Sequence, residues 1–330
     1  MTQLGKPLSV IGMVGERIHS LLAPRRASPR ADSATAIIGH RGAASELPEN
    51  TVESCRRAIQ QGADGVEVDV CVTRDGHAVL WHNRDPNYPV SMLAKLAGLK
   101  EAFVTRAPDA GSPARRPVSR LDLAEFLATH SYQKVGDVVL DGLDLDARST
   151  VKVDVLPDLY RWLECEPRAR RVMLDVKLSA EEIELTRPLL EELERLSSQQ
   201  GDRRSCRVQL LTTELEIFVE LAKEIPRYPA LRHCEPVADF ELPGVLERAR
   251  EIEARHVGIG LPPTRTWRAV RDEIEQVLDA RSRGDVETVL VWTLNDEDML
   301  KDAIGLGVNA ILTDDVPLAR RLAAERGASV

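Results

Sequence analysis

The chain has 330 residues, of which 43% are hydrophobic and 4% aromatic, a length that suits one large domain or two. Its 44 basic and 53 acidic side chains give a formal net charge of −9, which, without a long basic run, argues against nucleic acid as the main partner. No stretch reaches the eighteen consecutive apolar residues of a membrane span, so we expect a soluble protein.

The first 35 residues precede the recognisable pattern and form a separate leader. They lack the long apolar region of a secretory signal, but residues 15–30 hold four arginines against one glutamate. A mitochondrial-type leader, a weak membrane-surface helix and a disordered extension are the alternatives. Five scattered cysteines, an odd number without close pairs, favour a reducing intracellular compartment, either cytoplasmic or at a membrane surface.

The first regular elements enclose a polar pair. Residues 36–39 form a short apolar run typical of a buried strand, and His40 and Arg41 follow it directly. Gly42 permits a tight turn after them. A helix is predicted from Asn50 or Thr51, either of which is a good N-cap, until Gly62. The polar pair therefore lies at the carboxyl end of a strand.

The next strand, residues 65–70, carries two alternate carboxylates. Successive side chains of a strand point to opposite faces, so Glu67 and Asp69 share one face, roughly 6 to 7 Å apart along the backbone. Two unpaired like charges are costly in a barrel interior, and a bound Mg²⁺ or Ca²⁺ would keep both ionised. A turn at 73–76 and a returning strand at 78–81 then bring His82 back to the same region.

These motifs, in this order and spacing, resemble the glycerophosphodiester phosphodiesterase family. The family signature is a strand-ending His-Arg, then Pro-Glu-Asn-Thr, Glu-x-Asp, Thr-x-Asp-Gly and a second His, and all occur here. Residues 171–177, 291–295 and 307–314 are similar to later strands of the family. The resemblance covers residues 36–320 and implies an α/β fold, a (β/α)8 TIM barrel over residues 36–325.

The remaining chain alternates strand-like and helix-like segments, which is typical of a parallel α/β fold. Strands are expected at 171–176, 206–211, 230–234, 256–261, 288–294 and 308–312, and helices at 157–164, 180–198, 214–224, 242–254, 266–281 and 296–304.

The pattern breaks between residues 86 and 150, which we interpret as an insert after the second strand. Proline and glycine mark a loop near residues 108–117. The insert is either a substrate cap or a passive excursion. An apolar series at near-helical spacing predicts an interfacial helix or a helix packed on the barrel; it consists of Val90, Met92, Leu93, Leu96, Leu99 and Phe103.

Two histidines beside a pair of carboxylates favour acid–base chemistry. Histidine exchanges protons near neutral pH, so we expect His40 and His82 to be catalytic. The donor fork of Arg41 suits a phosphate oxygen beside a metal, although it also suits a carboxylate.

Three further site residues are implied by the resemblance or by their neighbours. Asp175 falls where the family supplies a third metal carboxylate, although many members have Glu there. Lys177 faces the same way and either meets phosphate or pairs with Asp175. Trp292 occupies a recurrent family position and either contacts the alcohol side of the substrate or belongs to the core. Asn83 follows His82 where many members have Asp.

The resemblance implies metal-dependent hydrolysis of a glycerol phosphodiester, with Mg²⁺ or Ca²⁺ held by Glu67, Asp69 and Asp175. In the family, an adjacent glycerol hydroxyl attacks, and water opens the resulting cyclic phosphate. The run at 173–177 is similar to the phosphatidylglycerol-specific phospholipase C branch, so the substrate is either a small deacylated molecule or a lipid reached by peripheral membrane contact. The alternative is a catalytically inactive barrel that binds a phosphodiester or lipid.

Overall fold

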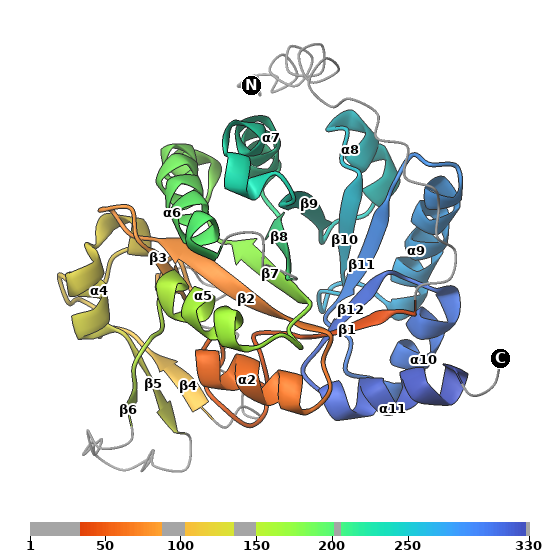
Figure 1. The fold of residues 1–330 in the computed structure, drawn as a ribbon, viewed down its shortest axis with the longest axis horizontal. Coiled ribbons are helices and arrows are strands. Elements are labelled where there is room, and N and C mark those ends of the chain that lie inside the picture. Colours follow the sequence, from red (N-terminus) through yellow and green to blue (C-terminus); the bar gives the residue numbers. More distant parts are fainter. Residues whose placement is uncertain (1–33, 88–102, 135–149, 201–205, 328–330) are drawn as a thin grey trace, which may run out of the picture.

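Eight parallel strands close into a barrel in the computed structural model, which describes residues 34–87, 103–134, 150–200 and 206–327 (Figure 1). β1 pairs with β12 on one side and with β2 on the other, and this pairing completes the ring. The strands follow one another around the barrel as β1 (Ala36–Gly39), β2 (Gly65–Val72), β7 (Arg171–Val176), β8 (Arg207–Thr212), β9 (Glu235–Phe240), β10 (His256–Gly260), β11 (Thr288–Trp292) and β12 (Ala310–Thr313). The structure confirms the predicted TIM barrel.

Helices surround the strands on the outside (Figure 1). The first of them begins where predicted, because the Thr51 side chain accepts a hydrogen bond from the Ser54 backbone N–H. Across the described residues, no helix combines the length and the apolar character needed to cross a membrane. The helices are α2 (Val52–Gln60), α5 (Leu156–Cys165), α6 (Thr186–Gln200), α7 (Leu215–Glu224), α8 (Val245–Glu251), α9 (Trp267–Ser282), α10 (Glu297–Leu306) and α11 (Val316–Gly327).

Alternation along the strands divides the apolar side chains into two layers. Val66, Val68 and Val70 of β2 point outward into the large core between strands and helices. A smaller apolar cluster fills the barrel interior and includes Ile38, Met173 and Leu290. The side chains between the β2 valines therefore point into the barrel, as the sequence predicts.

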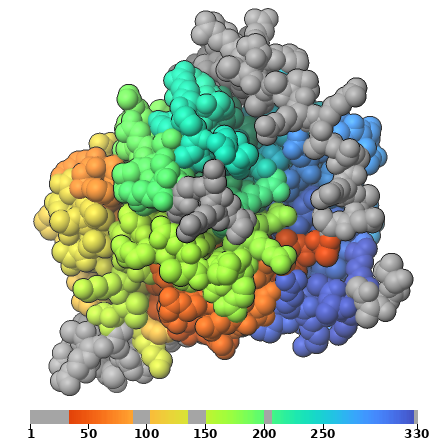
Figure 2. Space-filling view, in the orientation of Figure 1, coloured from red at the N-terminus to blue at the C-terminus, as the bar shows by residue number. Residues whose placement is uncertain are grey.

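The insert forms its own small unit beside the barrel. β3 (Ala78–Leu80) pairs antiparallel with the end of β2, and a separate three-stranded antiparallel sheet follows. Buried Trp81 anchors a satellite core with side chains of the insert, including Phe126 and Tyr132. In Figure 2 this unit stands at the left edge of the molecule. Its elements are β4 (Phe103–Arg106), a 3₁₀ turn (Val118–Arg120), α4 (Leu123–Thr129), β5 (Ser131–Lys134) and β6 (Thr150–Val151).

Several predicted features fall outside the described residues. These are the leader up to residue 33 and the apolar series of the insert, except Phe103, which opens β4 instead of ending a helix.

Two predicted elements are wrong. The strand expected at 230–234 is a 3₁₀ turn, Pro229–Leu231, and β9 follows it. Proline fixes the backbone at the first position of that turn, and the charged residues of β9 obscured its strand pattern. The single helix expected at 180–198 is a 3₁₀ segment, Ala180–Leu185, followed by α6; Glu182 leaves helical geometry, with φ −113° and ψ 18°.

Candidate active site

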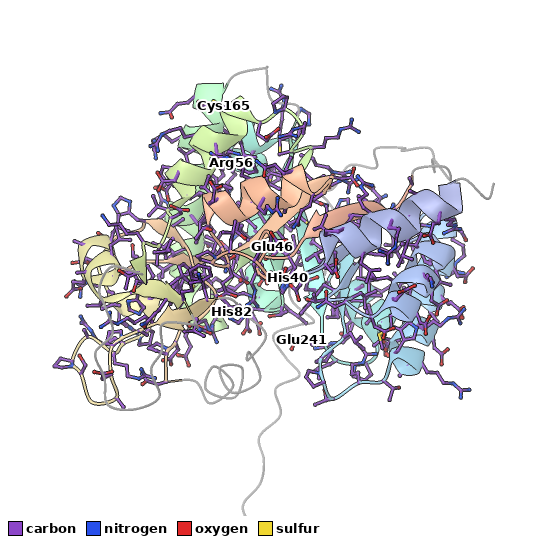
Figure 3. All side chains as sticks on the ribbon, turned by 90° about the horizontal axis from the view of Figure 1, so that it is seen from below. His40, Glu46, Arg56, His82, Cys165 and Glu241 are labelled. Carbon is purple, nitrogen blue, oxygen red and sulfur yellow. The ribbon has the colours of Figure 1, made fainter. Side chains whose placement is uncertain are left out.

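The predicted site residues gather at the carboxyl ends of the barrel strands. His40 follows β1, and β3 runs back along β2 so that the Trp81 N–H donates to the Asp69 carbonyl. This return places His82 next to the barrel mouth. In Figure 3, His40 and His82 lie at the same end of the barrel as Glu241, which follows β9, whereas Cys165 at the end of α5 lies at the opposite end.

Three carboxylates form the centre of the site. Glu67 and Asp69 are 2% and 1% exposed, and Asp175 is the Cα partner of Asp69 in the adjoining strand. One oxygen from each lies within 4.8 Å of the others. Glu67 Oε1 is buried and has no hydrogen-bond partner among the described residues. Burial, and then the neighbouring Asp69 charge, raises the pKa of Glu67 to about 8. A divalent cation bound between these oxygens would offset the repulsion among the three carboxylates. It would also give Glu67 Oε1 a partner.

The loop after β1 and the start of α2 orient the carboxylates. The Arg41 backbone N–H donates to Glu67 Oε2 at 2.9 Å, and its guanidinium contacts Glu49 at 2.6 Å and Asp69 at 3.0 Å. Asn50 donates to Asp69 Oδ2 and accepts from the Asp69 N–H, both at 2.8 Å. Arg41 and Asn50 both have positive φ, 54° and 56°. Such strained backbone is common at functional sites.

Glu49 and Asn50 were not predicted as site residues. From the Pro-Glu-Asn-Thr motif that contains them, the sequence predicts only the start of a helix. The structure shows that the motif also supplies a partner for Arg41 and a clamp for Asp69.

Lys177 lies between two of the carboxylates. Its Nζ is 3.0 Å from Asp69 Oδ1 and is also bonded to Asp175 Oδ2. Burial alone would raise the pKa of Asp69, but Arg41 and Lys177 outweigh it and hold that pKa well below its usual value. Of the two predicted alternatives, the ion pair is therefore present, and it extends to a second carboxylate.

His40 is held by a carboxylate. Its Nδ1 lies 2.8 Å from Asp314 Oδ1, and Asn295 donates to the other Asp314 oxygen at 2.6 Å. Burial disfavours the imidazolium, but Asp314 more than offsets this and raises the pKa of His40. Sequence reasoning missed Asp314 as a site residue, although it ends a segment that resembles the family.

His82 is held by a neutral amide instead. Its Nδ1 is 3.1 Å from Asn83 Oδ1. Burial and then the nearby Arg41 charge lower the pKa of His82 to about 3. The two histidines thus share one geometry, with Nδ1 anchored and Nε2 left for proton exchange, but differ in the charge of the anchor.

Trp292 lies further around the ring, on a strand that is separated from β1 by β12. It ends β11, and its Nε1–H donates to Asp239 Oδ1 at 3.1 Å. Asp239 is only 2% exposed and was missed, because the strand that carries it was predicted a few residues too early.

A cavity of about 370 Å³ opens beside this site. Its lining includes His40, Arg41, Glu49 and Asp314. A larger cavity, about 420 Å³, lies between α6 and the turn before β9 and contains none of the predicted site residues. The chemistry of its lining, and not its size, associates the first cavity with the candidate site.

Comparison with known proteins gives a consistent result. The profile of the Glycerophosphoryl diester phosphodiesterase family matches residues 40–318. A glycerophosphodiester phosphodiesterase of Caldanaerobacter subterraneus is 49% identical over 49 residues, 15% of this chain and 20% of that protein. Human Glycerophosphodiester phosphodiesterase 1 is 43% identical over 62 residues, 19% of each chain. The matched stretches thus span about a fifth of these relatives.

Solved structures agree over a longer range. A putative glycerophosphoryl diester phosphodiesterase from Silicibacter pomeroyi covers 92% of this chain and 96% of its own, with TM-score 0.65 and 20% identity. An Oleispira antarctica phosphodiesterase, solved with the product sn-glycerol-3-phosphate, covers 88% and 97%, with TM-score 0.59 and 18% identity. At such identities the likeness shows the fold. Together with the profile match over most of its length, this establishes that the chain belongs to the glycerophosphoryl diester phosphodiesterase family.

Proposed function

We propose that the chain hydrolyses phosphodiesters of glycerol with the help of a divalent cation and two histidines. One observation carries the proposal: three inward carboxylates, one with a buried unpartnered oxygen, share a barrel mouth with two histidines whose Nδ1 atoms are fixed. Buried acids with shifted pKa values cluster at functional sites, and the carboxyl end of the strands is where TIM-barrel enzymes place their active sites.

The residues present fit a cation. Glu67, Asp69 and Asp175 supply oxygen ligands, which Mg²⁺ and Ca²⁺ prefer. When bound, the cation neutralises charge on a phosphoryl oxygen and lowers the pKa of an oxygen nucleophile. Lys177 contributes by balancing the charge of the two aspartates that it contacts.

The surrounding side chains position the diester and move its protons. The Arg41 guanidinium donates to Glu49 through Nη1 and forms an ion pair with Asp69 on the Nε side, so within the described residues Nη2 is left for a phosphate oxygen. One histidine takes a proton from the attacking hydroxyl as its oxygen bonds to phosphorus. The other gives a proton to the departing alkoxide as its phosphorus–oxygen bond breaks.

The attacking hydroxyl in this proposal is the adjacent one of glycerol, and water opens the cyclic phosphate in a second step. The glycerol moiety is supported by the Oleispira antarctica relative, whose structure contains sn-glycerol-3-phosphate. The alcohol on the other side of the phosphate is either a small deacylated group or a diacylglycerol, as in phosphatidylglycerol.

A substrate panel tests the proposal. Protein stripped with a chelator is assayed with Mg²⁺, Mn²⁺ and Ca²⁺ on glycerophosphoglycerol and on phosphatidylglycerol vesicles. We expect metal-dependent release of glycerol phosphate, with the double variant His40→Ala/His82→Ala as the background control. Calorimetric metal binding without turnover of either substrate would contradict hydrolysis and favour the inactive binding barrel.

A further inference from the structure

Asp239 and Trp292 form a pair that reaches across a strand of the barrel. They belong to β9 and β11, which are separated by β10, yet Trp292 Nε1 donates to Asp239 Oδ1 at 3.1 Å. The registers place Gly258 opposite Asp239 and Gly260 opposite Trp292. The two side chains therefore meet inside the barrel, above a strand that carries no side chain at either position.

The two glycines are required by this pair. A Cβ at Gly258 would lie 1.4 Å from Asp239 Oδ1, and a Cβ at Gly260 would lie 3.0 Å from Trp292 Cζ2. Glycine inside a strand weakens it, so it marks a place where another group approaches closely. Here that group is the carboxyl–indole pair.

Asp239 is costly to bury and has no part in the chemistry proposed above. It is 2% exposed, and burial, followed by the Asp175 charge, raises its pKa well above the usual value. The three-carboxylate cluster does not include it. A buried polar group of this kind is stabilised by its hydrogen bond, which here goes to Trp292.

The pair lies opposite the catalytic groups. Around the closed ring, β10, above which the pair meets, is four strands from β2 in either direction, and β9 and β11 are each two strands from β7 and β1. A phosphate bound at the carboxylates leaves its alcohol to extend across the mouth. Trp292 is half-buried at the end of β11 and would lie beside an alcohol that extends this way.

We propose that Asp239 is a positioning residue that fixes the Trp292 indole. Through the indole it selects diesters by the alcohol group that they carry. The inference deepens the proposed function and rests on it for the substrate. An immobile indole presents a flat apolar face, which suits the C–H surface of a polyol alcohol and offers little to a methyl group.

A spectroscopic test is independent of turnover. The chain has four tryptophans, so the emission of Trp292 is obtained by subtracting Trp292→Phe from each parent protein. Asp239→Val removes the acceptor, whereas Asp239→Asn keeps an amide oxygen for the indole N–H. We expect acrylamide quenching of Trp292 to rise about twofold in the valine variant, because the ring loses its one hydrogen bond to Asp239, and to stay unchanged in the asparagine variant.

Steady-state kinetics test whether Asp239 affects selection of the alcohol group. Loss of one hydrogen bond corresponds to roughly a fivefold change in an equilibrium, so Asp239→Val should raise KM for glycerophosphoglycerol by about that factor, with kcat within about twofold. The methyl ester of glycerol phosphate should show no change in KM, and Asp239→Asn should restore the wild-type value. An equal rise in KM for both substrates would contradict a role in alcohol selection.

Gly258→Ala provides a matched control. The added Cβ meets Asp239 Oδ1, so we expect this variant to reproduce the quenching of Asp239→Val. In an Asp239→Ala background the clash is absent, and the same change should alter quenching little.

Unchanged quenching in Asp239→Val, with a melting temperature that shows it is folded, overturns the inference. If wild-type protein turns over no diester, the proposed function fails while the quenching result still decides the role of Asp239.

Discussion

Acidic side chains have different surroundings at the two ends of the barrel. At the amino end, Asp64 just before β2 accepts hydrogen bonds from Arg320 at 2.6 Å and from the Ile37 backbone at 2.9 Å. Glu287 just before β11 pairs with Arg255 at 2.6 Å. Each of these acids has a cation from a neighbouring segment, and such pairing at the amino end serves stability.

At the carboxyl end, acids face other acids. Glu67 and Asp69 share the interior with Asp175, and Glu67 Oε1 lacks a partner within the described part of the chain. Lys177 and Arg41 compensate part of this charge. The difference marks the carboxyl end as the one with a crowded acidic cluster that could hold a cation, and it predicts separate consequences for mutations at each end.

The largest effect is expected from the histidines. His40→Ala and His82→Ala should each lower kcat by at least about 10²-fold, because each removes a proton-transfer group. The melting temperature should change little, since both side chains lie at the functional end. Steady-state kinetics with thermal unfolding measure both quantities. Wild-type turnover by either folded variant would disprove its catalytic role.

The second effect concerns the crowded carboxylates. Glu67 has a raised pKa in the folded protein, so folding without metal takes up protons, and stability falls as pH rises from about 4.5 to about 8. Glu67→Gln should remove this dependence and raise the melting temperature of the metal-free protein near pH 8, while it weakens metal binding. Thermal unfolding across this range and calorimetric titration with Mg²⁺ test both parts.

Asp64→Asn is the control for that experiment, because it neutralises an acid that is already paired. It should lower the melting temperature and leave metal affinity unchanged. Unaltered metal affinity in Glu67→Gln would remove Glu67 from the proposed site.

A smaller effect is expected at the amino end. Glu235 accepts two hydrogen bonds from Arg207 and one from buried Gln209 at 3.2 Å. Glu235→Gln should destabilise the protein by about 1 kcal/mol, since it weakens a charge-assisted bond, and should leave kcat unchanged. Urea unfolding and kinetics measure the two. A large loss of turnover with full stability would show that the two ends are not independent.

The smallest effect distinguishes the two histidines by their anchors. Asn83→Asp places a carboxylate beside His82 and should raise its pKa by about one unit. If His82 is the general base, the acidic limb of the kcat/KM profile moves to higher pH; if it is the acid, the alkaline limb moves up. Asp314→Asn removes the carboxylate from His40 and should move the other limb down. An unchanged pH profile in both variants would show that Asn83 and Asp314 do not influence proton transfer.

The sequence by itself determined the barrel, the first strands and which carboxylates come together in it. A strand alternates its side chains every residue, so Glu67 and Asp69 necessarily share the face opposite the β2 valines. The short spacing from His40 to His82 keeps these groups on consecutive elements, where local pattern is reliable. The single misplaced strand, β9, is the one where proline and charged residues interrupt the apolar pattern.

Only the tertiary structure decided which distant side chains meet. His40 and Asp314 are 274 positions apart, and closure of the ring between β1 and β12 brings them together. The contact of Trp292 with Asp239 depends on the register of three strands and on Gly258 between them. The periodicity of a strand fixes the face on which each side chain lies. Which side chain it contacts depends on how strands far apart in the sequence align, and the closed barrel sets that alignment.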